Sequence, residues 1–143
     1  MIVKQLSAFI ENKAGRLAEL AETLAANDVD VSALSLADSA DYGVARMIVS
    51  DPEKAAKVLR ESGVICKITS VLAVAMEDTP GGFAKVLHLL KNQSHEIKYM
   101  YACISRHEGK ALMIFSVEDV NAAEALIAGT SAGNVHPGDI YRL

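Results

Sequence analysis

The spacing of apolar residues changes between a strand-like and a helical period along the chain, and the same order of changes occurs twice. The first half predicts, in order, a strand at 2–10, a helix over 17–24, strands at 29–36 and 44–49, a helix over 55–59 and a strand at 64–68. The second half predicts strands at 71–77, 95–104, 111–115 and 139–143, with helices over 83–90 and 120–127. Each half therefore reads strand, helix, strand, strand, helix, strand.

The two halves are also related residue by residue. The segment from Glu11 to Ala18 aligns with the segment from Glu77 to Ala84 at an offset of 66, since 77 − 11 and 84 − 18 both equal 66. The same offset continues without a gap over about forty pairs and includes the identities Leu24/Leu90, Gly43/Gly109, Ala45/Ala111, Met47/Met113, Ile48/Ile114 and Ser50/Ser116. A fixed internal period of this kind indicates a duplicated structural unit.

The helix pattern suggests how each unit is layered. Every predicted helix has one apolar face, so the two helices of a unit can cover one face of its antiparallel sheet. This predicts an α+β chain of two tandem ferredoxin-like βαββαβ modules, at 1–69 and 70–143, with no flexible linker between them. The continuous apolar character of 44–49 and 111–115 predicts central strands.

Two helix starts have local signals of different kinds. Asp51 followed by Pro52 predicts an N-cap with proline at the first helical position, while Ser116 and Asp119 resemble a capping box.

Charge and hydropathy exclude several classes of protein. The net charge is −4, and the basic residues are scattered, so we expect no nucleic-acid partner. The longest apolar run, at 71–76, is far shorter than the ~20 residues of a membrane-spanning helix. The chain starts with a strand-like pattern instead of a secretion signal, which predicts a cytoplasmic protein without membrane contact.

Catalytic and metal-binding patterns are not assembled in the sequence. The four histidines, His88, His95, His107 and His136, share no metal-ligand spacing, and neither GxGxxG nor a P-loop occurs. We therefore expect no catalytic residues, no metal and no cofactor.

The duplicated glycine is the strongest candidate for chemistry. Gly15 and Gly81 each lie between a strand end and a helix start, where glycine permits a positive φ and close approach of a ligand. The N-terminus of a helix offers N–H donors and partial positive charge, which favour a carboxylate. The alternative at this stage is a tight turn that binds nothing.

The stretch 74–84, Val-Ala-Met-Glu-Asp-Thr-Pro-Gly-Gly-Phe-Ala, resembles the first strand, loop and helix start of an ACT domain, where D-x-P-G precedes a large apolar residue. The repeat extends the resemblance over nearly the whole chain, although 12–15 reads Asn-Lys-Ala-Gly in the first copy. The resemblance implies modules that pair side by side and bind an amino acid at the interface between modules. It implies two candidate loops, formed by Asn12, Ala14, Gly15, Arg16 and Leu17, and by Asp78, Pro80, Gly81, Gly82 and Phe83.

The resemblance also directs attention to the second strand of each module. Many ACT domains have an amide near its start, whereas this chain has Asp30 and Glu96, which could receive a ligand ammonium or could be exposed acids. Tyr99 and Tyr101 share one face of their strand, with Met100 on the other. They could line a ligand pocket, or they could belong to an interface or core.

We expect from these features a homodimeric sensor that binds an amino acid and acts on a partner enzyme or regulator by population shift. The alternative is an oligomerisation or interaction module that binds no ligand.

Overall fold

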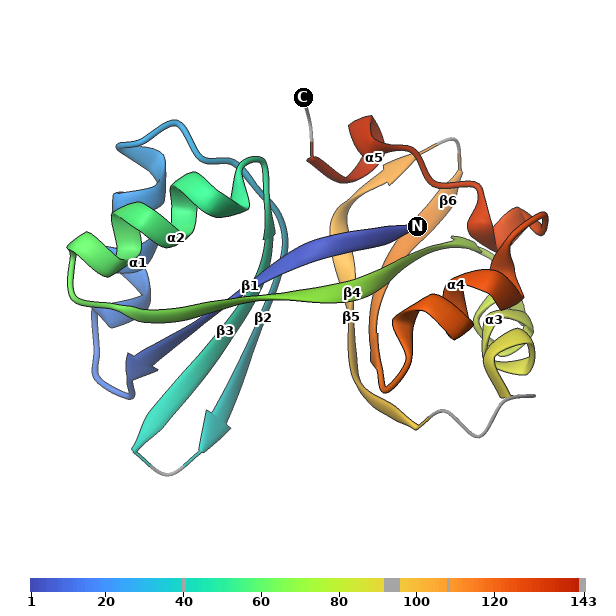
Figure 1. Cartoon of the computed structure of the whole chain (residues 1–143), viewed down its shortest axis with the longest axis horizontal. Helices are drawn as coiled ribbons and strands as arrows, with labels where there is room; N and C mark the ends of the chain where they lie inside the picture. The colour runs from blue at the N-terminus through green and yellow to red at the C-terminus, as the bar shows by residue number, and fades with distance from the viewer. Residues whose placement is uncertain (40, 92–95, 108, 142–143) are drawn as a thin grey trace. The chain divides into compact units, whose positions relative to one another are not determined.

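The computed structural model describes residues 1–39, 41–91, 96–107 and 109–141 of the 143-residue chain. These residues divide into two compact units, shown with their helices and strands in Figure 1. We call Lys4–Thr69 together with Tyr141 the first module, and Met1–Val3 together with Ser70–Ile140 the second module. The division into domains at 1–69 and 70–143 stays a prediction.

The first module has an antiparallel sheet with β3 (Tyr42–Val49) between β1 (Ile2–Glu11) and β2 (Val31–Ser39). The central position of β3 was predicted from its apolar run, and Ile48 and Val49 are both fully buried. The pairing Glu11↔Tyr42 places the end of β1 beside the start of β3.

Two helices cover one face of this sheet. Helix α1 (Arg16–Ala25) contacts α2 (Pro52–Glu61), and Figure 1 shows both on the same side of the strands. Asp51 caps α2 by accepting a hydrogen bond from the Lys54 N–H at 3.0 Å, and Pro52 stands in the first turn, as predicted. The core between helices and sheet is formed by alternate strand residues, one face of each helix and Val29 of the connection between α1 and β2. Its other members are Leu6, Ala8, Ile10, Leu20, Leu24, Ala45, Met47, Val49, Ala55, Ala56, Leu59 and Cys66.

The second module repeats this arrangement. Strand β6 (Lys110–Val117) lies between β4 (Ile65–Glu77) and β5 (Ile97–His107), and the helices α3 (Gly82–Lys91) and α4 (Val120–Ile127) contact each other. The core holds Leu72, Val74, Val86, Leu90, Phe115, Val117, Ala123, Ile127 and Ala132. The α+β architecture of two ferredoxin-like modules with helices on one face of antiparallel sheets is thereby confirmed.

Strand β4 is longer than the two strands predicted at 64–68 and 71–77. It runs without interruption for 13 residues, so it begins in the first module and ends in the second. No glycine or proline lies within Ile65–Glu77 to stop it.

The predicted strand at 139–143 is wrong, and residues 142–143 lie outside the described part of the chain. Pro137–Tyr141 forms the short helix α5, preceded by the 3-10 helix η1 (Ser131–Gly133). Pro137 suits a first helical position, and Asp139 accepts a hydrogen bond from the His136 N–H at 2.8 Å. The N-terminus pairs beside β4 instead: the main chains of Met1 and Ala73 exchange two hydrogen bonds, of 3.0 and 2.8 Å.

The predicted capping box at 116–119 is also wrong. Ser116 lies inside β6, and Asp119 itself caps α4 by accepting a hydrogen bond from the Ala122 N–H at 3.0 Å. The helix therefore starts three residues later than that motif implies.

Among the described residues, no helix is long and apolar enough to cross a membrane.

Candidate functional site

A glycine turn joins a strand to a helix in each module, and the two turns have the same backbone geometry. The φ angles of Gly15 and Gly81 are 89° and 88°, in the left-handed region that favours glycine. In the first turn, the Arg16 N–H donates to the Lys13 carbonyl at 3.3 Å and the Glu19 N–H donates to the Gly15 carbonyl at 3.0 Å. The second turn has the same two bonds 66 residues later, from the Gly82 N–H to the Thr79 carbonyl at 3.0 Å and from the Lys85 N–H to the Gly81 carbonyl at 3.1 Å.

The start of α1 is open to a ligand. Gly15 occupies the N-cap position, and no side chain caps the helix. A Cβ atom placed on Gly15 or Gly81 would meet no heavy atom within 4 Å, so the space beside both glycines is empty. First-turn N–H groups and the positive end of the helix dipole together favour an anion such as a carboxylate at this position.

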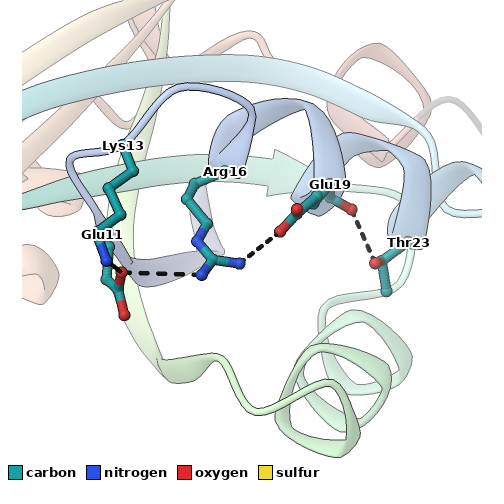
Figure 2. A network of polar contacts seen from close by, with 5 residues as sticks. All are labelled: Glu11, Lys13, Arg16, Glu19 and Thr23. Carbon is teal, nitrogen blue, oxygen red and sulfur yellow. Dashed lines mark hydrogen bonds and ion pairs between the residues drawn. The ribbon is translucent and has the colours of Figure 1, made fainter.

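Charged side chains surround the first turn. Figure 2 shows the Arg16 guanidinium between Glu11 and Glu19, with Lys13 on the far side of Glu11 and Thr23 one turn further along α1. Arg16 Nη1 donates to Glu19 Oε2 at 2.8 Å, while Arg16 Nη2 lies 3.8 Å from Glu11 Oε2. The ammonium of Lys13 lies 2.8 Å from the same Glu11 oxygen.

These ion pairs shift the ionisation of their members. Lys13, and then Arg16, hold the pKa of the Glu11 carboxyl below its usual value. The carboxylates of Glu19 and Glu11 raise the pKa of Arg16. Glu11 is therefore an anion, and Arg16 is a cation, throughout the neutral range.

Beside this network lies a cavity of about 390 Å³ within the first module. Its walls come from the end of β1, one face of α1 and the turn between α2 and β4. The lining residues are Phe9, Ile10, Glu11, Arg16, Glu19, Leu20, Thr23, Ser62, Gly63 and Val64.

A smaller cavity of about 90 Å³ lies on the other side of the loop. It is bordered by Asn12, Lys13 and Leu17 and by the end of β2. Asn12 Nδ2 donates to Asp38 Oδ1 at 2.9 Å, which ties the loop to β2. Of the first predicted loop, Asn12 and Leu17 thus border the smaller cavity, Arg16 borders the larger one, and Ala14 and Gly15 form the exposed turn between them.

The second turn differs in its side chains. Asp78, Pro80 and Gly81 are exposed, and Phe83 keeps 41% of its surface accessible. Gly82 is buried, and a Cβ there would lie only 2.0 Å from the Glu77 carbonyl oxygen, so α3 starts in close contact with the end of β4. At this turn Lys85 Nζ lies 2.8 Å from Glu77 Oε2.

Within each module, the predicted acid of the second strand is far from the glycine turn. Asp30 is exposed and exchanges main-chain and hydroxyl hydrogen bonds with Ser50. The register Val31↔Val49 and Glu11↔Tyr42 places this end of the sheet seven β3 residues from the turn, or roughly 24 Å. Glu96 is exposed and directly precedes Ile97, which pairs with Val117. The second turn follows Glu77, which pairs with Lys110, so Glu96 is separated from its turn by the same seven residues, here along β6.

The aromatic segment lies in the first half of β5. Met100 packs against the core beneath the helices, whereas Tyr101 pairs with Ile114 and is 8% exposed. Tyr99 is half-buried and pairs with Ser116. The alternation of Met100 against the two tyrosines is as predicted, and a role of all three residues in ligand binding stays a prediction.

Several residues of the larger cavity were not predicted as site residues. Glu11 could have been found, because it recurs as Glu77 in the repeat, and Glu19 stands three residues after Arg16 on the predicted helix. The wall formed by Ser62, Gly63 and Val64 comes from a turn more than forty residues later. Local patterns contain no signal for that contact.

In the described ranges, no three His, Cys, Asp or Glu side chains gather as a metal site would require.

Comparison with known proteins agrees with the duplicated fold. The family model described as an ACT domain pair matches residues 1–142. The solved structure of protein BT0572 from Bacteroides thetaiotaomicron is 36% identical, with a TM-score of 0.90 over 100% of this chain and 98% of that one. A search of curated protein sequences finds no match.

Two more distant structures share the fold. The ligand-free regulatory subunit of aspartate kinase from Thermus thermophilus is 15% identical, with a TM-score of 0.63 over 89% of this chain and 93% of that one. The corresponding subunit from Thermus flavus is 14% identical, with a TM-score of 0.59 over the same shares. The fold is thus one found in regulatory subunits, and the chain belongs to the ACT domain pair family.

Proposed function

We propose that this protein is a regulatory sensor that binds an amino acid at its glycine turns and acts on a separate partner protein. The observation that carries the proposal is the duplicated turn itself. Both copies keep glycine at φ near 90°, with empty space beside it and a helix start directly after it. Open space beside a glycine also occurs at Gly129, so the support comes from its combination, in both copies, with a helix start whose N–H donors favour an anion.

The shared strands supply a route for a signal. β1 begins in the second module and ends at the Gly15 turn, whereas β4 begins in the first module and ends at the Gly81 turn. Each turn therefore follows a strand whose other end belongs to the other module. A ligand that favours one position of a turn would shift the population of states in both modules, and a partner could read that shift.

The partner and the assembly belong to the same proposal. The aspartate kinase subunits with this fold are described as regulatory. We infer by analogy that this chain forms a homodimer in the cytoplasm and regulates an enzyme or another regulator without catalysing a reaction itself.

A thermal-shift screen against the twenty amino acids, followed by calorimetry, tests the proposal. A ligand at a hundredfold excess over its Kd should stabilise the protein by about 2.7 kcal/mol, which raises Tm by several degrees. Gly15→Val or Gly81→Val should abolish the shift by distorting a turn. Gly129→Val is the matched control, because Gly129 has φ 76° and no neighbour within 4 Å but lies at neither turn.

A ligand-induced shift that survives in both turn variants would contradict the proposed site. The absence of any shift would favour the alternative, an interaction module without a ligand. A specific surface supports that alternative: Leu34 and Leu36 are 41% and 51% exposed, and an apolar groove of about 400 Å³ lies between α1 and the strands. Its lining is Leu17, Ala18, Leu20, Ala21, Leu24, Val31, Leu34 and Met47.

A further inference from the structure

The 390 Å³ cavity of the first module combines a charged rim with an apolar wall. Its volume lies within the roughly 300–1,000 Å³ typical of small-molecule sites. All of its lining residues belong to the first module. In Figure 2 the charged side chains extend from the end of β1 and from α1 on the side of the pale green ribbon of α2 and β4.

The rim presents opposite charges side by side. Arg16 and Glu19 are three residues apart on α1, so their guanidinium and carboxylate groups are neighbours. An α-amino acid also has its two opposite charges only a few bonds apart. Its carboxylate would pair with Arg16 and its ammonium with Glu19, which is complementary in sign at both positions.

The donors and acceptors on the rim fit the same head group. Arg16 Nη2 is 3.8 Å from Glu11, too far for a hydrogen bond, so a ligand carboxylate can take its N–H donors. The Thr23 hydroxyl donates to the Glu19 carbonyl at 2.9 Å, and the Ser62 hydroxyl donates to the Val58 carbonyl at 3.0 Å. With their protons engaged, both hydroxyl oxygens are left as acceptors for an ammonium.

The remaining wall selects the side chain. Phe9, Ile10, Leu20 and Val64 also line the cavity, and Ile10 and Leu20 are buried. A charged or strongly polar ligand side chain would lose its hydration against these residues without a partner. An apolar side chain would instead be stabilised by burial.

We propose that this cavity binds the head group and side chain of an apolar α-amino acid, an inference that rests on the proposed function and narrows its ligand. Leucine and phenylalanine are the reference ligands. Arg16 turns from Glu11 toward the ligand carboxylate and keeps its pair with Glu19. The cavity lies on the α2 side of α1, and the Gly15 turn lies at its edge.

Calorimetry with matched ligands tests whether the cavity recognises both the carboxylate and the ammonium of an amino acid. Leucine is compared with isopentylamine and 4-methylpentanoate, and phenylalanine with phenethylamine and 3-phenylpropanoate, each analogue lacking one charge. At least one of the two amino acids should bind, and both of its analogues should bind at least tenfold more weakly. An analogue that binds as tightly as its amino acid would overturn the inference.

Matched variants test whether this cavity is the site. Arg16→Met should weaken binding at least tenfold, whereas Lys57→Met, which removes an exposed basic side chain of α2 outside the cavity lining, should not. Thr23→Trp should fill the cavity and block binding, whereas Glu22→Trp places the same ring on α1 at a residue outside the lining. Circular dichroism and Tm confirm that all four variants fold.

The outcomes separate this inference from the proposed function. Binding of an amino acid that is lost in Gly81→Val but unchanged in Arg16→Met and Thr23→Trp would overturn the cavity and leave the sensor in place. Selective binding of a charged amino acid would overturn the apolar class. If none of the twenty amino acids binds, the sensor and the cavity are both refuted.

Discussion

The two glycine turns have the same backbone and different side chains. The first turn is surrounded by Lys13, Arg16 and two glutamates, whereas the second has Thr79 and Gly82 at the positions of the two basic residues. The duplication has therefore kept the main-chain geometry that can hold an anion and changed the groups that would choose the ligand. We expect the two turns to bind differently, with charge selection confined to the first.

The two modules also differ in how their sheets are completed. The first module includes residues of β4 that follow α2 directly in the chain, as its repeat pattern predicts. The second module ends in a helix and includes Met1–Val3 from the other end of the chain. Conversely, the Tyr141 hydroxyl of the C-terminal helix accepts a hydrogen bond from the Lys4 N–H of the first module at 3.1 Å. This exchange of chain ends predicts that the stability of each module depends on the other.

The largest expected effect on stability, and a test of that dependence, comes from a mutation that creates a cavity in the core of each module. Leu59 in the first module and Ile127 in the second are both fully buried. Leu59→Ala and Ile127→Ala should each lower the free energy of unfolding by about 2–5 kcal/mol. Because β1 and β4 are shared, each variant should still unfold in a single transition in urea, with equal loss of amide-exchange protection in β3 and β6. Early unfolding of the mutated module alone would show that the modules are independent.

A smaller change in the free energy of unfolding is expected when the same repeat position is mutated to alanine in the two turns. Gly82→Ala should lower the free energy of unfolding by about 1–3 kcal/mol, because its Cβ would lie 2.0 Å from the Glu77 carbonyl oxygen and force α3 to move. Arg16→Ala at the equivalent position keeps a Cβ that the first turn already accommodates. It should change stability by less than about 0.5 kcal/mol. Equal losses in urea unfolding would mean that the two helix starts are not packed differently.

The sequence predicts well those features that depend on local spacing. The first module's six elements, the glycine turns and the Asp51 cap all follow from residues within a few positions of each other. The C-terminal strand was predicted wrongly because its replacement is non-local: Met1 pairs with Ala73, 72 residues away. The repeat suggested a strand at 139–143, but Pro137 and Gly138 interrupt it and favour a helix start.

The candidate site shows the same limit. The turn residues are predictable from the repeated glycine, and Arg16 was among the predicted ligand contacts. The opposite wall, formed by Ser62, Gly63 and Val64, becomes part of the site only when α2 packs beside α1. Side chains that meet through tertiary packing cannot be paired from one sequence, whereas residues three apart on one helix can.

The smallest expected effect concerns the ion pair that replaces the first turn's network in the second module. The hydrogen bond and charge of Lys85 lower the pKa of the Glu77 carboxyl from its usual 4.5, just as Lys13 and Arg16 lower that of Glu11. A carboxyl whose pKa is lowered by folding contributes stability above its unfolded pKa, and that contribution is lost as the pH falls through the lowered folded value. Both pairs are exposed, so the loss should be small and should shrink further in high salt. Carboxyl-carbon NMR titration should show that Lys85→Met returns Glu77 toward its usual pKa and leaves Glu11 shifted. An equal change at both carboxyls would mean that the two turns share one electrostatic environment, against the contrast drawn from their side chains.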